Sequence, residues 1–398
     1  MKYLWIGVTN SPEGRAHVVQ NGGKLLSAEV SNDALLSGLA ENGAVCDSIN
    51  ATSLPAYPHY PEKKIRSFRW ESAHGAHGVS VGYKNLKYVG LLFKRRALVK
   101  EAKAWAKAHR GDDVTVFIYQ MHTPFMAAAK AVKRIIPHAK IVLIVPDLPQ
   151  FMDLHMSRVK RVLKKIDWCS IRRLMKQVDR YVLYSRHMAD FLKLKDGLWT
   201  VMEGSFDPSL LIEDTPKAQS EKISVMYSGV LDMRYGIGEL LDAFTLLGEN
   251  YELWLTGAGN AVPLIEERAK SDRRICYLGF LPSRTDLLRK QHEATMLIST
   301  RNPAEPASAY CFPSKIFEYM VSGNPVISTR ILGIPEEYFE HLILLDDISP
   351  ASLAKAIRSV SDMPTESREA FGRAAADFVI ENKNNVAQTR RMLDFANL

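Results

Sequence analysis

The sequence contains two successive series of short apolar runs that alternate with segments of helical periodicity. Runs of this kind are typical of parallel strands that are covered by helices on both faces. The two series are 3–8, 114–119, 140–145, 180–185 and 199–203, and then 223–228, 251–256, 275–278, 296–299, 325–328 and 342–345. Their order predicts an α/β protein with two doubly wound, Rossmann-like domains.

The domain boundaries follow from a polar stretch between the two series. We predict an N-terminal domain over 1–204, a linker over 205–222 and a C-terminal domain over 223–378. Residues 379–398 are expected to form a C-terminal helix that can return to the N-terminal domain. Ligands of such sheets bind beyond the carboxyl ends of the strands, so a cleft between the domains is the expected site.

Composition limits the class of protein. The chain has 398 residues, of which 46% are hydrophobic and 24% are charged, as in ordinary globular proteins. The N-terminal apolar run is too short for a membrane span and lacks the cleavage site of a signal peptide. The four cysteines are scattered without metal-binding spacing, which favours reduced thiols, a cytoplasmic location and no metal site.

Segment 312–327 has the pattern of a loop, a helix, a glycine stop and a buried strand. Pro313 suits the first turn of the helix, and Ser314 is predicted to be its N-cap. Free amides and the positive dipole end at such a terminus suit a diphosphate. Lys315 would add a cation, and Glu318 would accept hydrogen bonds from sugar hydroxyls. The alternative is a capped core helix with a surface glutamate.

Other candidate residues lie just after predicted strands. In the second domain, Gly229 would allow close approach of a ligand to the backbone, and Arg234 would neutralise a diphosphate or remain a solvated loop residue. In the first domain, the amides of Gly22 and Gly23 would face an anion, unless they belong to a flexible loop. His122 follows a strand, where a lone histidine is more often structural.

Segment 313–327 resembles the nucleotide-sugar segment of glycosyltransferase family 4, the retaining enzymes with the GT-B fold. The resemblance implies two Rossmann-like domains that face a central cleft, with Glu318 on the donor ribose and Gly257 beside the donor. The chain departs from the family pattern at Tyr310, where a second glutamate is common, and at Val230, where a basic residue is usual.

The resemblance extends to the first domain and implies the acceptor side of the reaction. Some family members have a histidine in the region of His122 that contacts the transferred sugar or the acceptor hydroxyl. Asp147 lies in an Asp-Leu-Pro sequence that is similar to bacterial polysaccharide transferases of this family. Asp147 would therefore bind the acceptor, or else cap a turn.

Segment 155–180 contains nine Lys or Arg and two Asp, interleaved with apolar residues at helical spacing. A basic amphipathic helix of this kind can lie on an anionic bilayer. The alternative is a surface helix that packs one face on the core. Because many family members use lipid-linked acceptors, we expect membrane association, with 94–96 adding to the basic charge.

The sequence thus predicts a retaining hexosyltransferase without a metal or cofactor, with His122, Arg234 and Lys315 as its catalytic residues. Its donor would be a nucleoside diphosphate sugar, most plausibly a UDP-hexose. Its acceptor would be a glycan or lipid-linked glycan of capsule or exopolysaccharide synthesis. We expect a cytoplasmic protein at the inner face of the plasma membrane.

Three other functions remain open at this stage. A sugar-nucleotide epimerase of the same fold would bind the donor without an acceptor. A non-catalytic nucleotide-sugar-binding partner protein would account for Tyr310 and Val230. A nucleic-acid-binding protein is suggested only by the basic segment, and we do not expect nucleic acid as a partner.

Overall fold

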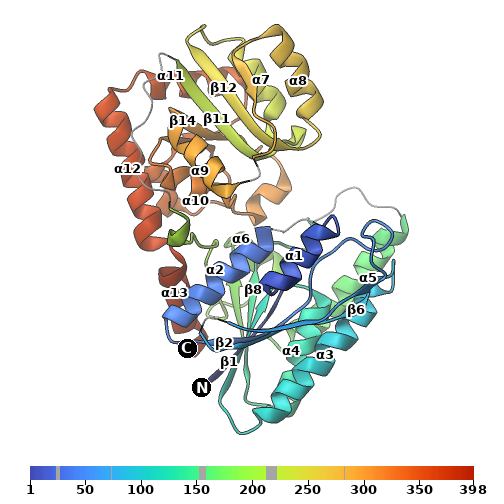
Figure 1. The fold of residues 1–398 in the computed structure, drawn as a ribbon. Helices are drawn as coiled ribbons and strands as arrows, with labels where there is room; N and C mark the ends of the chain where they lie inside the picture. Colours follow the sequence, from blue (N-terminus) through green and yellow to red (C-terminus); the bar gives the residue numbers. More distant parts are fainter. Residues whose placement is uncertain (24–26, 73, 152–157, 212–221, 282) are drawn as a thin grey trace. The chain divides into compact units, whose positions relative to one another are not determined.

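The computed structural model describes all residues except 24–26, 73, 152–157, 212–221 and 282 (Figure 1). The chain forms two compact units, which are described separately. Unit 1 consists of Met1–Ser205 and Asn385–Leu398, and unit 2 consists of Phe206–Asn384. The predicted linker falls mostly on 212–221, outside the described residues, and is followed in unit 2 by a strand from Ile223.

Unit 1 is built on a sheet whose described strands have the order β10-β9-β8-β7-β1-β2-β5-β4. All neighbours are parallel except β4 and β5. The bounds are β1 (Lys2–Gly7), β2 (Cys46–Asn50), β4 (Phe68–Glu71), β5 (His77–Ser80), β7 (Val114–Tyr119), β8 (Lys140–Val145), β9 (Arg180–Leu183) and β10 (Trp199–Val201). A separate antiparallel pair joins β3 (Lys64–Ile65) to β6 (Tyr83–Lys84).

The helices of unit 1 lie around this sheet, and most of them bury apolar residues (Figure 1). They are α1 (Pro12–Gln20), α2 (Ser27–Glu41), α3 (Gly90–Ala108), α4 (Thr123–Ile135), α5 (Arg158–Met175), α6 (His187–Leu192) and α13 (Asn385–Asn397). Helix α4 packs against both α3 and α5. The most buried strand, β7, has no exposed residue.

The C-terminal segment crosses from unit 2 to unit 1 between Asn384 and Asn385. Helix α13 packs on α2. The Gln388 side-chain amide donates a hydrogen bond of 2.8 Å to the Gly204 carbonyl, and Asn42 donates one of 2.8 Å to Val386. The segment predicted as one helix over 379–398 is therefore two helices, because Thr365–Asn382 forms α12 of unit 2.

Unit 2 has a parallel sheet with the strand order β13-β12-β11-β14-β15-β16. Its strands are β11 (Ile223–Val230), β12 (Tyr251–Ala258), β13 (Ile275–Tyr277), β14 (Met296–Ser299), β15 (Val326–Thr329) and β16 (Ile343–Leu345). Its helices are α7 (Ile237–Phe244), α8 (Val262–Ser271), α9 (Arg284–Glu293), α10 (Lys315–Val321), α11 (Pro350–Ser361) and α12. Two apolar clusters, one on each face of the sheet, form its core.

The predicted fold class is confirmed, since both units are doubly wound around mainly parallel sheets. The basic segment forms α5 from Arg158 onward, and its residues 155–157 lie outside the described part. On α5, Ile171 and Leu174 are buried, whereas Val162, Leu163 and Ile166 are exposed.

Candidate functional site

The candidate donor site of unit 2 lies where the chain direction in the sheet reverses. Strands β11 and β14 are neighbours, but the chain proceeds from β11 to β12 on one side and from β14 to β15 on the other. The loops that leave the carboxyl ends of two such strands separate, and ligands of open α/β sheets bind there. Gly229 and Lys315 both lie at this edge.

Two glycines shape the edge beside this switch point. Gly229 and Gly257 are paired in register on β11 and β12. Both have positive φ values, 122° and 135°, which side chains with a Cβ rarely adopt. A Cβ atom on Gly257 would overlap the carbonyl oxygen of Gly229. Both predicted glycines are therefore required by the backbone itself, which leaves Gly229 exposed at the edge.

Lys315 is the cation closest to this glycine pair. Its Nζ atom lies 3.8 Å from the centre of the Tyr227 ring and 3.2 Å from the place where a Cβ on Gly229 would be. Burial lowers the pKa of Lys315 to about 7, while Glu318 raises it and Arg301 lowers it further. Lys315 is therefore about half protonated at neutral pH, and any anion that binds beside it stabilises the charged form.

The start of α10 differs from the sequence prediction. Ser314 occupies the predicted N-cap position, but it has helical angles (φ −54°, ψ −24°) and its side chain makes no capping hydrogen bond. The Ile316 and Phe317 amides donate to the Pro313 and Ser314 carbonyls at 2.9 and 3.2 Å. This short 3₁₀-type start uses the amides of Ile316 and Phe317, and not the Ser314 and Lys315 amides that are predicted to face a diphosphate.

Glu318 lies one turn after Lys315 and is held by an arginine that the sequence did not indicate. The Arg284 side chain, from the first residue of α9, donates to Glu318 Oε1 at 2.9 Å. The Nε atom of Arg284 is buried and has no hydrogen-bond partner in the described part of the protein. Glu318 keeps a second carboxylate oxygen for a ligand, and the arginine fixes its orientation.

Two further arginines border the site. Arg234 is exposed and donates two hydrogen bonds of 2.9 Å to Asp232, whose pKa falls to about 2 mainly because of these bonds. Arg301 follows β14 and donates to Ser308 Oγ at 3.2 Å. Because its charge lowers the pKa of Lys315, Arg301 adds positive potential at the switch point. The sequence offers a signal for Arg301, because this residue lies just after a buried strand.

In unit 1, His122 occupies the N-cap position of α4, after the carboxyl end of β7. Its backbone amide donates to Gln120, a residue with the uncommon φ of 71°. The Nδ1 atom of His122 is buried and lacks a partner among the described residues. Burial, with a smaller contribution from Lys94, lowers the pKa of His122 to about 3, so the ring is neutral at neutral pH.

Lys94 is the second buried titratable group near His122. It is 7% exposed, and its Nζ atom donates to the Thr52 carbonyl at 3.2 Å and lies 4.8 Å from the centre of the Tyr83 ring. Burial lowers the pKa of Lys94 to about 8. The expectation that 94–96 form a basic surface is therefore wrong for Lys94. Asp147 is exposed after β8, at the same sheet edge.

The glycines of the first domain have another role than predicted. Helix α1 separates them from β1, and they end this helix. The Gly22 amide donates to the Val19 carbonyl at 3.0 Å, and the Gly23 amide donates to Val18 at 2.9 Å. This pair of bonds closes the C-terminus of the helix. The amides are thus occupied and do not face an anion, which corrects the prediction for Gly22 and Gly23.

Two further properties concern possible ligands of the described residues. No cluster of three or more His, Cys, Asp or Glu among them is arranged to hold a metal ion. None of the helices in these same ranges combines the length and apolar character that crossing a bilayer requires.

Comparison with known proteins assigns a class to unit 2. Residues 222–362, about a third of the chain, match the family model described as glycosyl transferases group 1. The match includes β11 to β16 and therefore the whole switch-point site. It supports a glycosyltransferase. No significant match was found among curated proteins.

Solved structures resemble the whole chain. HepE from Anabaena in complex with UDP has a TM-score of 0.67 at 14% identity, with 100% of both chains covered. Sucrose-phosphate synthase from Thermosynechococcus elongatus has a TM-score of 0.67 at 16% identity, covering 99% of this chain and 98% of that one. The lipopolysaccharide outer core galactosyltransferase WaaB has 0.64 at 14%, covering 99% of both. These similarities show that the chain has the GT-B fold.

Proposed function

We propose that the protein is a retaining glycosyltransferase of family 4 that transfers a hexose from a UDP-sugar to a glycan or lipid-linked acceptor. The observation that carries this proposal is Lys315, held beside the Gly229–Gly257 pair at the switch point of unit 2. The group 1 match over 222–362 supports it, as do neighbours whose structures contain UDP and UDP-glucose.

In the proposed donor site, different residues contact the diphosphate and the ribose of the nucleotide. The backbone at Gly229 leaves room for the diphosphate, because no side chain projects there. Lys315 and Arg301 supply positive potential, and Arg234, exposed and hydrogen-bonded to Asp232, adds a further cation. Glu318, fixed by Arg284, accepts hydrogen bonds from the ribose hydroxyls. These cations would stabilise the diphosphate most strongly when it gains negative charge as its bond to the sugar breaks. This stabilisation of the transition state would accelerate the transfer.

Lys315 is suited to stabilise the leaving group without a metal ion. A diphosphate beside Nζ favours the charged ammonium, so its pKa rises from about 7 when the donor binds. The lysine is then a full cation when the bond to the sugar breaks. Unit 1 would supply the acceptor side, with His122 as a neutral hydrogen-bonding group and Asp147 as an acceptor contact.

The test is a thermal shift with UDP-glucose as the probe. A ligand at 100 times its dissociation constant stabilises a protein by roughly 2.7 kcal/mol, and this shift should be clear in the native protein. Glu318→Ala should abolish it, and Lys315→Met should reduce it strongly. Lys270→Met, at an exposed position of α8, provides a control with a similar change of charge and should retain the full shift. An unchanged shift in Glu318→Ala would exclude the ribose contact.

We also propose that α5 contacts an anionic membrane, as expected for a lipid-linked acceptor. The support is the exposed apolar row Val162, Leu163 and Ile166 on a helix rich in Lys and Arg. Sedimentation with anionic vesicles should recover the native protein but not a variant with Asp at all three positions. Equal recovery of both proteins would argue against α5 as the contact.

A further inference from the structure

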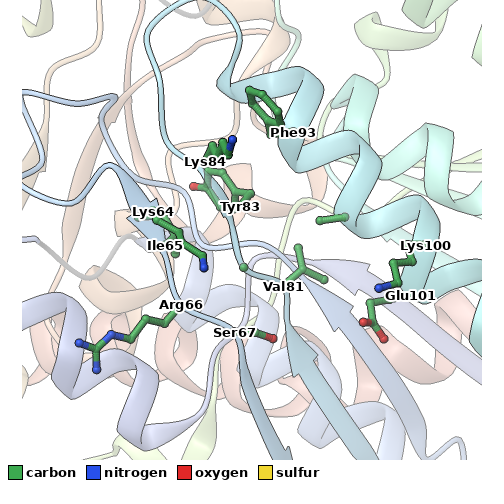
Figure 2. A pocket seen from close by; sticks show the side chains of 12 residues that line it. Lys64, Ile65, Arg66, Ser67, Val81, Tyr83, Lys84, Phe93, Lys100 and Glu101 are labelled. Carbon is green, nitrogen blue, oxygen red and sulfur yellow. The ribbon is translucent and has the colours of Figure 1, made fainter.

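Unit 1 contains a cavity of about 620 Å³ whose lining includes neither His122 nor Asp147. It lies between the β3–β6 pair and helix α3 (Figure 2). Its volume is within the range of pockets that hold small-molecule ligands. Its lining residues are Lys64, Ile65, Arg66, Ser67, Val81, Gly82, Tyr83, Lys84, Phe93, Ala97, Lys100 and Glu101.

The floor of this cavity is apolar and firmly held. Ile65, Val81 and Tyr83 are buried, and Phe93 and Ala97 of α3 complete the apolar lining. The Tyr83 hydroxyl donates to the Thr52 carbonyl at 2.9 Å, so its ring is fixed as part of the wall. A rigid apolar floor of this kind favours a hydrocarbon portion of a ligand.

The rim of the cavity is positively charged. Lys64, Lys84 and Lys100 are exposed, and none forms an ion pair within the described ranges of the chain. The carboxylate on the rim, Glu101, is bound by Arg69 at 2.9 Å and is therefore neutralised. Arg66 is the fourth basic residue of the lining, so the cavity has four basic side chains and one carboxylate (Figure 2).

The surface beside Phe93 is also apolar. Tyr88, Leu91 and Leu92, around the first turn of α3, are 58%, 48% and 54% exposed. The Lys84 ammonium lies 5.4 Å from the centre of the Phe93 ring, so charge and apolar surface meet here. Large apolar side chains next to lysines are typical of surfaces that enter the headgroup layer of a membrane. Arg95 and Arg96 are exposed on the same helix. A free acidic sugar or phosphate would have no use for these apolar side chains.

We propose that this cavity binds one anionic phospholipid, with its phosphate between the lysines and the start of an acyl chain over Phe93 and Ala97. The lysine charges and the apolar floor each match one part of such a molecule. The inference extends the proposed membrane association by naming the lipid class and its site, and it is independent of the donor chemistry.

The experiment titrates the full chain with dihexanoyl phosphatidic acid below its micellar concentration, by isothermal calorimetry. We expect saturable one-to-one binding, with much weaker binding of dihexanoyl phosphatidylcholine and of inorganic phosphate. The triple variant Lys64→Ala/Lys84→Ala/Lys100→Ala should weaken binding on the order of 100-fold, because each lysine near an anionic surface contributes about fivefold. Ala97→Trp, which fills the floor, should also abolish binding.

Controls separate this site from general charge and from the donor site. Lys103→Ala/Lys107→Ala, exposed on the same helix, should bind the lipid as the native protein does. The triple variant should keep its UDP-glucose thermal shift, which shows that it is folded and tests the donor site independently. The inference is overturned if the native protein does not saturate, if inorganic phosphate binds as tightly, if an oligouronate is preferred, or if the variants bind unchanged.

Discussion

The pH dependence of donor binding should report directly on Lys315. With a pKa of about 7, this lysine is about nine-tenths charged at pH 6 and about 3% charged at pH 8.5. If the bound diphosphate keeps the ammonium charged over this range, the free protein must take up a proton on binding at high pH. The dissociation constant for UDP-glucose should therefore increase about 30-fold from pH 6 to pH 8.5.

The sign follows from linkage. The donor raises the lysine pKa, so the bound state holds more protons above pH 7 and affinity falls as pH rises. UDP-glucose is preferred to UDP because its diphosphate is esterified at both ends and has no terminal phosphate that titrates near pH 6.

Isothermal calorimetry in buffers with different ionisation enthalpies measures both the affinity and the protons taken up. Native protein should take up close to one proton at pH 8.5 and few at pH 6. Lys315→Met should bind weakly with an affinity that does not vary with pH, while Lys315→Arg should bind without pH dependence because its guanidinium stays charged. A native protein with constant affinity, or a Met variant with the native slope, would refute the reasoning.

Three further predictions concern stability. Gly257→Ala should lower the free energy of unfolding by about 3 kcal/mol or more in urea titration, because its Cβ overlaps the Gly229 carbonyl at a φ of 135°. Tyr319→Phe should cost roughly 1–3 kcal/mol in the same assay, since it leaves the buried Ser228 amide without the 2.8 Å bond to the Tyr319 hydroxyl. The native pKa of Lys94, about 8, is below its unfolded value, so the free energy of unfolding should rise as the pH is raised from about 8 towards 10. Lys94→Met should remove this part of the pH dependence.

The strands were predictable where both faces are buried. Every residue of β7 is buried, and its continuous apolar run reflects this directly. Helix α1 was missed because, apart from Gly14 and Val18, its residues are not buried and it has almost no apolar face. Strand β4 was missed for a related reason, since its residues are only exposed or half-buried. Strand β2 is largely buried and is missed as well, because its sequence Cys-Asp-Ser-Ile-Asn has no continuous apolar run.

The site shows a similar division between local and distant contacts. The positions of Gly229, Gly257 and Lys315 at strand ends and a helix start are predictable, because these are local features that a sequence displays. Arg284 is 34 positions from Glu318 and meets it only through the packing of α9. The error at Gly22 and Gly23 has a local cause, because an unrecognised helix before them consumes their amides.

The charge of the proposed donor site would depend on its ligand. Burial and the charge of Arg301 both disfavour the charged form of Lys315. In the empty site the lysine therefore releases a proton, which lowers the repulsion between the two cations. A diphosphate reverses both effects and restores the full charge next to Gly229. An arginine at this position could not do this, because its guanidinium stays protonated and would repel Arg301 in the empty site. A lysine here therefore allows a compact cationic site that becomes fully charged when the donor is bound.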